Sequence, residues 1–188
     1  HGRPYLPNAE LGLPGDYQQF NLPGVLATLD ELRALGFRVT EAALRTGLRQ
    51  VVPLTGLRGR WSIIGQNPLV VCDTGHNADG LRAVVTQLRR LPHQQLHLVI
   101  GVVNDKDVTG LLALLPPEGT YYFCAANIPR ALAAEELTQQ ATAIGLSGRA
   151  YGSVAAATAA ARAAAAPQDV VFIGGSTFVV AEVDELYT

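Results

Sequence analysis

From Gly56 onward, short continuous apolar runs alternate with segments whose apolar residues recur at helical spacing. The run 69–72, Leu-Val-Val-Cys, is short and rich in β-branched residues, which is typical of a strand buried on both faces. Apolar residues at helical spacing follow it as far as Leu91. Because strands that alternate with helices pair in parallel, this pattern predicts an α/β fold: a mainly parallel sheet with helices on both faces.

The alternation continues to residue 186, and it assigns each element a residue range. We expect strands at 60–64, 69–73, 96–101, 120–125, 149–151 and 169–174, and helices at about 77–90, 108–115, 133–144, 154–166 and 178–186. Local signals support several helix ends. Pro92 follows the first helix and stops it, and Ser153 is a good N-cap for the alanine-rich helix.

The first 55 residues have a different pattern. One helix with a wide apolar stripe follows Asn21 and stops at Gly36, with Pro23 in its first turn, and a second helix, 41–49, is capped by Thr40 and ended by Pro53. Two helices without a sheet cannot make an independent core. We therefore expect residues 1–55 to be the incomplete tail of another domain and residues 56–188 to be a complete α/β domain. An apolar stripe without cover predicts self-association through residues 22–35.

Composition and charge narrow the class of protein. Hydrophobic residues make up 48% of the chain and the net charge is -2, which indicates a globular protein without a broad basic face for nucleic acid. No apolar run approaches the length of a membrane span, and the first residues do not resemble a signal peptide. Cys72 and Cys124 fall inside predicted strands as buried free thiols, so we expect a cytoplasmic protein.

The loop after the run 69–72 carries the densest candidate chemistry. Asp73, His76 and Asn77 would lie at the carboxyl end of a buried strand, where α/β sheets bind ligands. Asn77 is interpreted as the N-cap of the next helix. Asp73 either ties down loop amides or serves function. We favour function for Asp73 and His76, and expect both to matter for chemistry rather than for folding.

Further strand-to-helix loops would lie at the same edge of a parallel sheet. Lys106, the only lysine, stands between two aspartates, and Asp107 is interpreted as a helix cap. Ser176 and Thr177 follow two glycines and either hold an anion or cap the last helix. Arg130 is a weaker candidate. The sequence contains no phosphate-binding loop, no dinucleotide fingerprint, no zinc-ligand spacing and no nucleophile elbow.

Five motifs in order resemble one family. The stretch 73–77, Asp-Thr-Gly-His-Asn, is similar to the Asp-Gly-Ala-His-Asn of the C-terminal domain of folylpolyglutamate synthases and dihydrofolate synthases, in the Mur ligase superfamily. The other four motifs are Gly59-Arg60, Asp105-Lys106-Asp107, the stretch 175–182 with its final Glu182, and the stretch 15–21 with its final Asn21. This resemblance implies a Rossmann-like Mur ligase C-terminal domain, preceded by two helices left over from the central ATPase domain.

The resemblance also implies a reaction and roles for residues. Such ligases use ATP to activate the carboxylate of folate or dihydropteroate as an acyl phosphate, which the amine of L-glutamate attacks. Asn21 would contact adenine, and Arg60 and Asp73 would hold the ribose and phosphate side of ATP. Four residues would face glutamate and the acyl phosphate, namely His76, Lys106, Ser176 and Thr177, with His76 and Lys106 in catalytic roles.

In this family the phosphate loop and the magnesium ligands belong to an N-terminal ATPase domain. We therefore expect the chain to be the C-terminal part of a longer ligase and to be inactive alone. Thr74-Gly75 replaces the family's Gly-Ala, which affects the local loop geometry. Two alternatives stay open: the C-terminal domain of an amino-acid-adding Mur ligase, and a stand-alone α/β module that binds an anion.

Overall fold

The computed structural model describes residues 6–104 and 107–187. The chain divides into two compact units, His1–Arg58 and Gly59–Thr188, and each is considered by itself. The division lies three residues beyond the end of the segment 1–55 that the sequence pattern marks as distinct.

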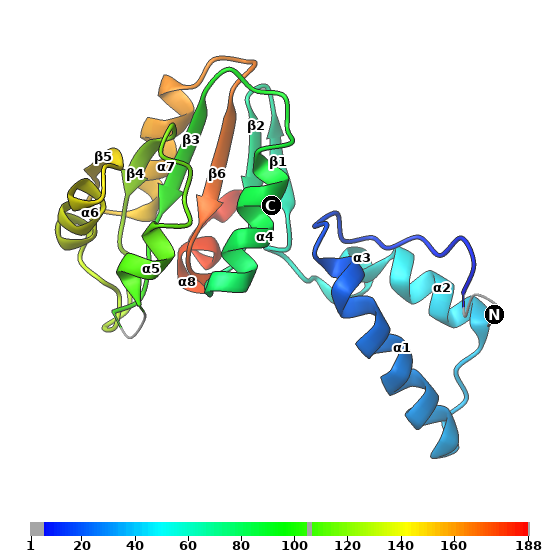
Figure 1. Cartoon of the computed structure of the whole chain (residues 1–188). Helices are drawn as coiled ribbons and strands as arrows, with labels where there is room; N and C mark the ends of the chain where they lie inside the picture. The colour runs from blue at the N-terminus through cyan, green and yellow to red at the C-terminus, as the bar shows by residue number, and fades with distance from the viewer. Residues whose placement is uncertain (1–5, 105–106, 188) are drawn as a thin grey trace. The chain divides into compact units, whose positions relative to one another are not determined.

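The second unit is built on a six-stranded sheet (Figure 1). Its strands, in spatial order, are β1 (Ser62–Gln66), β2 (Leu69–Cys72), β6 (Val170–Gly174), β3 (Leu96–Ile100), β4 (Thr120–Phe123) and β5 (Ser147–Ala150). Every neighbouring pair is parallel except β1 and β2, which are antiparallel. The prediction of a mainly parallel α/β sheet is confirmed.

The first strand differs from the prediction in position, and it is the antiparallel member of the mainly parallel sheet. It was expected at 60–64, but Trp61 has a positive φ of 54°, a conformation outside the β region, so the strand begins only at Ser62. Only Asn67 and Pro68 separate β1 from β2. A parallel pair needs a connection of about a dozen residues or more. A two-residue connection therefore allows only antiparallel pairing.

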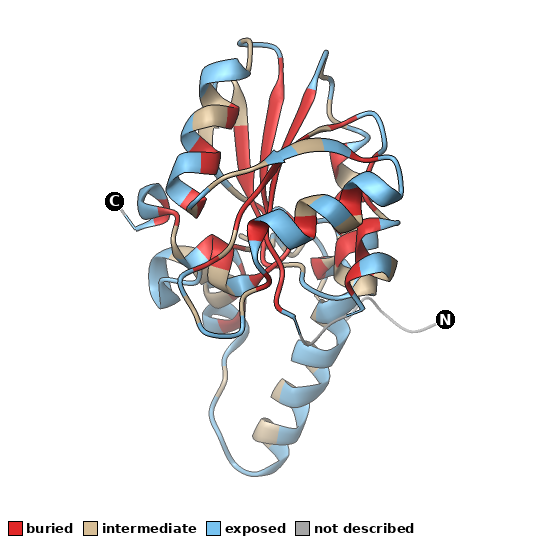
Figure 2. Cartoon of the chain, turned by 90° about the vertical axis from the view of Figure 1, so that its left-hand side faces the viewer, coloured by how far each residue is buried: buried red, intermediate tan, exposed pale blue. Residues whose placement is uncertain are grey.

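Helices cover both faces of the sheet. Val99 and Ile100 are neighbours on β3, so their side chains point to opposite faces. Val99 belongs to a core cluster with residues of α7 (Val154–Ala164), α8 (Thr177–Ala181) and the 3-10 helix η1 (Asp184–Leu186). Ile100 borders a small cavity with residues of α4 (Ala78–Leu88) and α5 (Val108–Leu112). The remaining helix, α6 (Ala134–Ala143), contacts β4 and β5. Figure 2 shows burial along the strands and on the inner sides of these helices.

The last predicted helix is interrupted. It was expected to run over 178–186, but α8 ends at Ala181 and η1 begins at Asp184. Between them Val183 has an extended backbone, with φ -90° and ψ 97°. Val183 is buried in the same core cluster as Val180 and Leu186. The chain therefore leaves the helical path where a β-branched side chain enters the core.

In its described residues the first unit contains three helices, α1 (Gln18–Ala34), α2 (Glu41–Arg49) and α3 (Val51–Thr55), so the expectation of two helices is wrong. The predicted cap is confirmed, because the Thr40 hydroxyl accepts a hydrogen bond from the Ala43 N–H at 3.1 Å. Asn21 does not precede α1 but lies inside it, and Pro23 falls beyond its first turn. Pro53 lies in the first turn of α3, where its missing N–H costs little.

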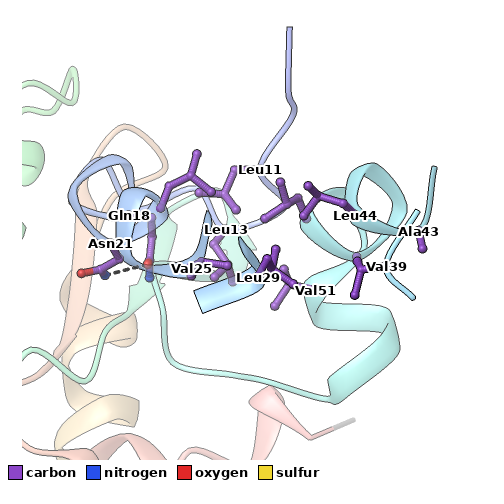
Figure 3. A pocket seen from close by; sticks show the side chains of 13 residues that line it. Leu11, Leu13, Gln18, Asn21, Val25, Leu29, Val39, Ala43, Leu44 and Val51 are labelled. Atoms are coloured by element: carbon purple, nitrogen blue, oxygen red, sulfur yellow. Dashed lines mark hydrogen bonds between the residues drawn. The ribbon is translucent and has the colours of Figure 1, made fainter. Parts of the chain in front are cut away.

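The first unit buries little apolar surface. Within its described residues, Leu44 and Leu48 are the only buried apolar side chains. Apolar residues of α1 and α2 and the preceding segment instead line a groove of about 390 Å³ (Figure 3). Leu22, Val25 and Leu29 of α1 are among the lining residues, so part of the predicted stripe faces its own unit. No helix in the described ranges is long and apolar enough to span a membrane.

Candidate functional site

Two loops interlock at the carboxyl end of β2, and Asp73 joins them. Its side chain is buried, with 1% of the residue exposed. Oδ2 accepts a hydrogen bond from the Trp61 N–H at 2.7 Å, and Oδ1 accepts one from the Gly75 N–H at 2.8 Å. The interpretation that Asp73 ties down loop amides is therefore confirmed. Both oxygens hold backbone, so Asp73 has a structural role, and its expected part in the chemistry stays a prediction.

Arg60 is fixed by the same pair of loops. Its guanidinium donates hydrogen bonds to the Thr74 hydroxyl and to the Gly59 carbonyl oxygen. The Thr74 N–H donates to that same carbonyl at 2.9 Å. Gly59 has a φ of +71°, and a Cβ there would lie 2.8 Å from Thr74 Cγ2 and from a methyl group of Val180. Only glycine fits this position, so the loop that carries Arg60 can approach β2 and α8 closely.

His76 is exposed, and its ring has a defined orientation. Its Nδ1 lies 3.0 Å from the Thr74 carbonyl oxygen. A carbonyl oxygen only accepts, so Nδ1 carries a proton, and Nε2 takes no part in this contact. Asn77 caps α4, since its side-chain oxygen accepts a hydrogen bond from the Gly80 N–H at 2.8 Å, which confirms the cap interpretation.

The turn after β6 lies beside these loops because β6 pairs with β2. The Asp73 N–H donates to the Ile173 carbonyl oxygen at 3.1 Å. Gly175 borders the same cavity as Gly75 and His76, a space of about 10 Å³ that is barely large enough for one water. Ser176 is buried and caps α8 by accepting the Phe178 N–H at 3.2 Å, whereas Thr177 is exposed. One edge of the sheet thus carries Arg60, Asp73, His76, Ser176 and Thr177.

The other predicted site residues belong to other elements or fall outside the described part of the chain. Asp105 and Lys106 are among the residues that the structure does not describe. Asp107 caps α5 by accepting the Gly110 N–H at 2.9 Å, as its cap interpretation predicts. Asn21 belongs to the first unit, where it is exposed on α1 and donates to the Gln18 side-chain oxygen at 2.9 Å.

The loop after β4 also reaches this edge. The Asn127 N–H donates a hydrogen bond of 2.6 Å to the Glu182 carboxylate, and the guanidinium carbon of Arg130 lies 4.8 Å from the centroid of the Phe178 ring. Both partners belong to the segment that follows Ser176. The sequence pattern assigned no role to Glu182 beyond its place in a motif.

Comparison with known proteins defines the family. The family model described as "Mur ligase, glutamate ligase domain" matches residues 59–177, which is most of the second unit. The chain belongs to this family. Its match begins at Gly59 and includes every loop that forms the edge described above as far as Thr177.

Individual relatives of this glutamate ligase domain are folate enzymes. The chain is 34% identical over 166 residues to the dihydrofolate synthase/folylpolyglutamate synthase of Escherichia coli, a match that covers 87% of this chain and 37% of that protein. The structure of E. coli FolC in complex with DHPP and ADP superimposes with a TM-score of 0.72 at 34% identity, over 84% of this chain and 37% of that one. The Mycobacterium tuberculosis folylpolyglutamate synthase complexed with ADP gives a TM-score of 0.81 at 25% identity, over 96% and 42%. The chain therefore spans well under half the length of these relatives.

The thiols of the ligase domain are not reactive groups. Burial raises the pKa of Cys72 to about 12, an effect that nearby Arg162 partly opposes. Burial likewise raises the pKa of Cys124 to about 12. A thiol with such a pKa is not a nucleophile at neutral pH. The prediction that both cysteines are buried free thiols is confirmed.

Two residues of the site were not expected from the sequence. Thr74 is buried and bonds both to Arg60 through its hydroxyl and to His76 through its carbonyl oxygen. Trp61 is buried with a positive φ and donates its N–H to Asp73. A threonine in a loop and a tryptophan near a strand give no local signal, because their partners come from another segment.

Proposed function

We propose that the chain forms the part of an ATP-dependent, ADP-forming ligase that adds L-glutamate to folate, to dihydropteroate, or to both. The proposal is supported by homology to the E. coli dihydrofolate synthase/folylpolyglutamate synthase and by the ADP and DHPP named in its structure. An oxygen of the substrate carboxylate attacks the γ-phosphorus of ATP and ADP departs. The glutamate amine then attacks the acyl carbon, phosphate leaves, and the amine loses a proton as the amide forms.

In this proposal Arg60 and Asp73 serve the ribose and phosphate side of ATP, and Asn21 contacts adenine. The Arg60 head group is held by Thr74 and Gly59, so its remaining N–H groups have a defined direction toward a phosphate. Asp73 contributes by holding the backbone of Trp61 and Gly75, which sets the distance between the two loops. The contribution of this pair to the reaction is positioning and charge stabilisation.

The proposed glutamate side comprises His76, Lys106, Ser176 and Thr177. His76 presents Nε2 to the ligand, and the buried Ser176 hydroxyl can donate to a carboxylate while it accepts from Phe178. Thr177 is exposed at the start of α8. An ammonium group at Lys106 would pair with a carboxylate of glutamate or with the acyl phosphate.

The triphosphate and magnesium need groups from elsewhere in the intact ligase. The sequence contains no phosphate-binding loop. In the described ranges no three His, Cys, Asp or Glu residues form a group that could hold a metal ion. We therefore propose that the chain alone is inactive and that ATP and magnesium are held mainly by another domain. We also place the ligase in the cytoplasm, since its buried thiols suit a reducing compartment.

The homology carries the proposed reaction, and the interlocked pair of loops beside the β6 turn carries the proposed site. It is tested in a full-length ligase in which this chain forms the corresponding segment. His76→Ala is expected to lower kcat/KM for glutamate about ten-fold or more, roughly 1.4 kcal/mol of transition-state stabilisation. His93→Ala is the matched control, because His93 Nδ1 also bonds a carbonyl two residues earlier, at 2.7 Å, but lies beyond the far end of α4.

Three outcomes are informative. Loss of activity in His76→Ala with an unchanged His93→Ala variant supports the assignment. If His76→Ala has the same kcat/KM for glutamate as His93→Ala, the proposed role of His76 is contradicted. A ligase that consumes ATP with a UDP-muramoyl peptide instead of a folate would show the amino-acid-adding alternative to be right.

We also infer that the first unit, when no other domain covers it, pairs with a second copy through residues 22–35. Leu35 and Val25 of this segment are exposed, by 76% and 45%, and Leu26 and Leu32 are only partly buried. Self-pairing about a two-fold axis covers such a surface without a new partner.

A further inference from the structure

The loop between β4 and α6, residues 124–133, is fixed to α8 at several points. The Glu182 carboxylate accepts the Asn127 N–H at 2.6 Å. The Arg130 guanidinium lies over the Phe178 ring, 4.8 Å from its centroid. Ala126 is buried in the same core cluster as Val179 and Val180, and Ile128 packs against that cluster. Because β4 and β6 are separated by β3, this loop must cross the end of β3 to reach α8.

The same loop pairs with the loop that follows β3. The Asn104 N–H donates to the Arg130 carbonyl oxygen, and the Leu132 N–H donates to the Val102 carbonyl oxygen, both at 3.0 Å. Val103 and Ala131 form an antiparallel bridge between these two hydrogen bonds. The segments 102–104 and 130–132 therefore make one short ribbon, and a displacement of either segment moves the other.

Glu182 is the charged contact in this arrangement. A hydrogen bond to a carboxylate is about twice as strong as one between neutral groups, and the 2.6 Å distance is short for an N–H donor. The cation–π contact of Arg130 adds a weaker attraction that depends on the same placement of the loop. Ser176 begins the helix whose end carries Glu182. Among the contacts that link the turn after β6 to the ribbon beyond β3, Glu182 thus supplies the hydrogen bond to a carboxylate.

We propose that Glu182 is a positioning residue for the amino-acid substrate, which it serves by holding the ribbon 102–104/130–132 at a fixed distance from Ser176 and Thr177. This inference rests on the proposed ligase function. Along the sheet edge, the β2 loops with Arg60 and Asp73 lie on one side of the β6 turn, and the ribbon lies on the other side. Loss of the Glu182 contact therefore affects the β3–β4 side of the edge and leaves the Arg60 side in place.

The first experiment measures the contact itself in the 188-residue chain. Amide hydrogen exchange is compared between the unaltered chain, Glu182→Ala and Asp184→Ala. Asp184 is an exposed acid two positions later whose side chain forms no hydrogen bond among the described residues, so it controls for loss of charge. Exchange in 125–132 and 102–104 is expected to rise at least ten-fold in Glu182→Ala only, with the strands unchanged. Unchanged protection in these segments would overturn the proposed link.

The second experiment separates positioning from a general structural role in the full-length ligase. Glu182→Ala is expected to raise KM for glutamate about ten-fold, with KM for ATP and kcat changed less than about two-fold. Glu182→Gln keeps an acceptor oxygen and should recover most of the lost affinity. A fall in kcat together with equal rises in the KM values for glutamate and ATP would contradict the positioning role. So would a Glu182→Gln variant with the same KM for glutamate as Glu182→Ala.

The two proposals fail in different ways. If the unaltered ligase shows no turnover that depends on glutamate, the proposed function is wrong, while the exchange data still report the link between Glu182 and Asn127. If the unaltered ligase uses glutamate and Glu182→Ala has the same KM for it, the function stands and the positioning role is wrong.

Discussion

Asp73 shows how one side chain can be structural within a candidate site. Its two carboxylate oxygens accept backbone N–H groups from residues 61 and 75, and it has almost no exposure to solvent. A hydrogen bond to a charged group contributes about 1.5–3 kcal/mol to stability. A buried N–H that loses its acceptor costs a similar amount.

Substitution of Asp73 is therefore expected to affect folding as well as activity. Asp73→Ala should lower the free energy of unfolding by about 2–4 kcal/mol, since a buried amide at Trp61 and a partly buried one at Gly75 lose their acceptor. Asp73→Asn keeps one acceptor oxygen and should lose less. Urea unfolding of the chain measures both changes, with the exposed His76→Ala as a comparison that should change stability by less than about 0.5 kcal/mol. Equal stability of Asp73→Ala and His76→Ala would show that the two amides do not depend on this carboxylate.

A second buried carboxylate lies at the opposite edge of the sheet. Asp169 Oδ1 accepts the Gln95 N–H at 3.0 Å, Oδ2 accepts the Ala166 N–H at 2.7 Å, and His97 Nε2 lies 3.4 Å from Oδ2. Burial by itself would raise the pKa of the Asp169 carboxyl. The two backbone N–H groups and the His97 ring more than offset burial and hold this pKa below its ordinary value.

A lowered pKa makes the contribution of Asp169 depend on pH in a defined direction. Its stabilisation is fully present above the unfolded-state pKa, about 3.9, and is lost as the pH falls from there through the lower folded-state pKa. The difference in unfolding free energy between the unaltered chain and Asp169→Asn should be largest near pH 7 and should shrink below about pH 4. Urea unfolding at a series of pH values measures it. A difference that stays constant down to pH 2 would contradict the lowered pKa.

The helix caps and Asp73 show which side-chain contacts can be predicted from a sequence. The caps at Thr40, Asn77 and Asp107 were predictable, because a cap and its N–H partner lie three residues apart. The partners of Asp73 were not, since the Trp61 N–H comes twelve residues earlier and depends on a backbone turn at that residue. Contacts within a few residues can be predicted from the sequence, whereas contacts between loops can be identified only once the fold is known.

Among the elements, the buried strands were predicted best and the ends of the unit least well. The run that forms β2 is apolar throughout and ends at a polar loop, so both its type and its bounds are clear from sequence. The antiparallel pairing of β1 follows from its two-residue connection to β2, whereas the break before η1 is visible only in the structure. In both places a single buried residue, Trp61 or Val183, has a backbone conformation that differs from the predicted one.

The turn between β6 and α8 gives a prediction at the element scale. Gly175 has a φ of +87°, and a Cβ there would lie 2.8 Å from the Gly101 carbonyl oxygen. Gly175→Ala should destabilise the chain by about 1–3 kcal/mol, because both the backbone conformation and the close approach oppose a side chain. Gly152→Ala is the matched control, since a Cβ there would meet no atom within 4 Å. Thermal unfolding measures both variants, and equal Tm values would contradict the strain argument.

At the scale of the whole molecule, the two units differ in how much apolar surface they bury. The Gly59–Thr188 unit has a core on each face of its sheet, whereas only two apolar side chains are buried in the described part of the first unit. The complete strand–helix alternation after residue 55 predicted the core of the second unit. The helices without a sheet before it predicted that the first unit has no core of its own. The sequence pattern predicted a second copy as the cover of the first unit but not the groove within the unit, because the groove depends on how its helices pack.

Self-association is the corresponding prediction. Leu26→Glu together with Leu29→Glu should make the chain monomeric, because charges in the apolar stripe cannot be buried at a self-paired surface. The thermal transition of the α/β unit should be unchanged. Light scattering at high protein concentration measures the molecular mass of the unaltered chain and of the double variant. A monomeric unaltered chain would show that the stripe is covered within its own unit, as the groove beside Leu29 would allow.

The position of β6 affects how this unit is made in the cell. β6 is the last strand in sequence but lies between β2 and β3 in the sheet. A nascent chain that has emerged from the ribosome only as far as β5 has no strand to join β2 to β3. The pair β1–β2 and the set β3–β4–β5 are then two separate parts of the sheet, each with an unpaired edge strand. Synthesis proceeds at about 5–20 residues per second, so the two separate parts persist for seconds and offer unpaired strand edges to chaperones. The sheet edge that carries Ser176 can form only after β6 has joined β2 to β3, so a chain translated only as far as β5 does not hold the complete candidate site.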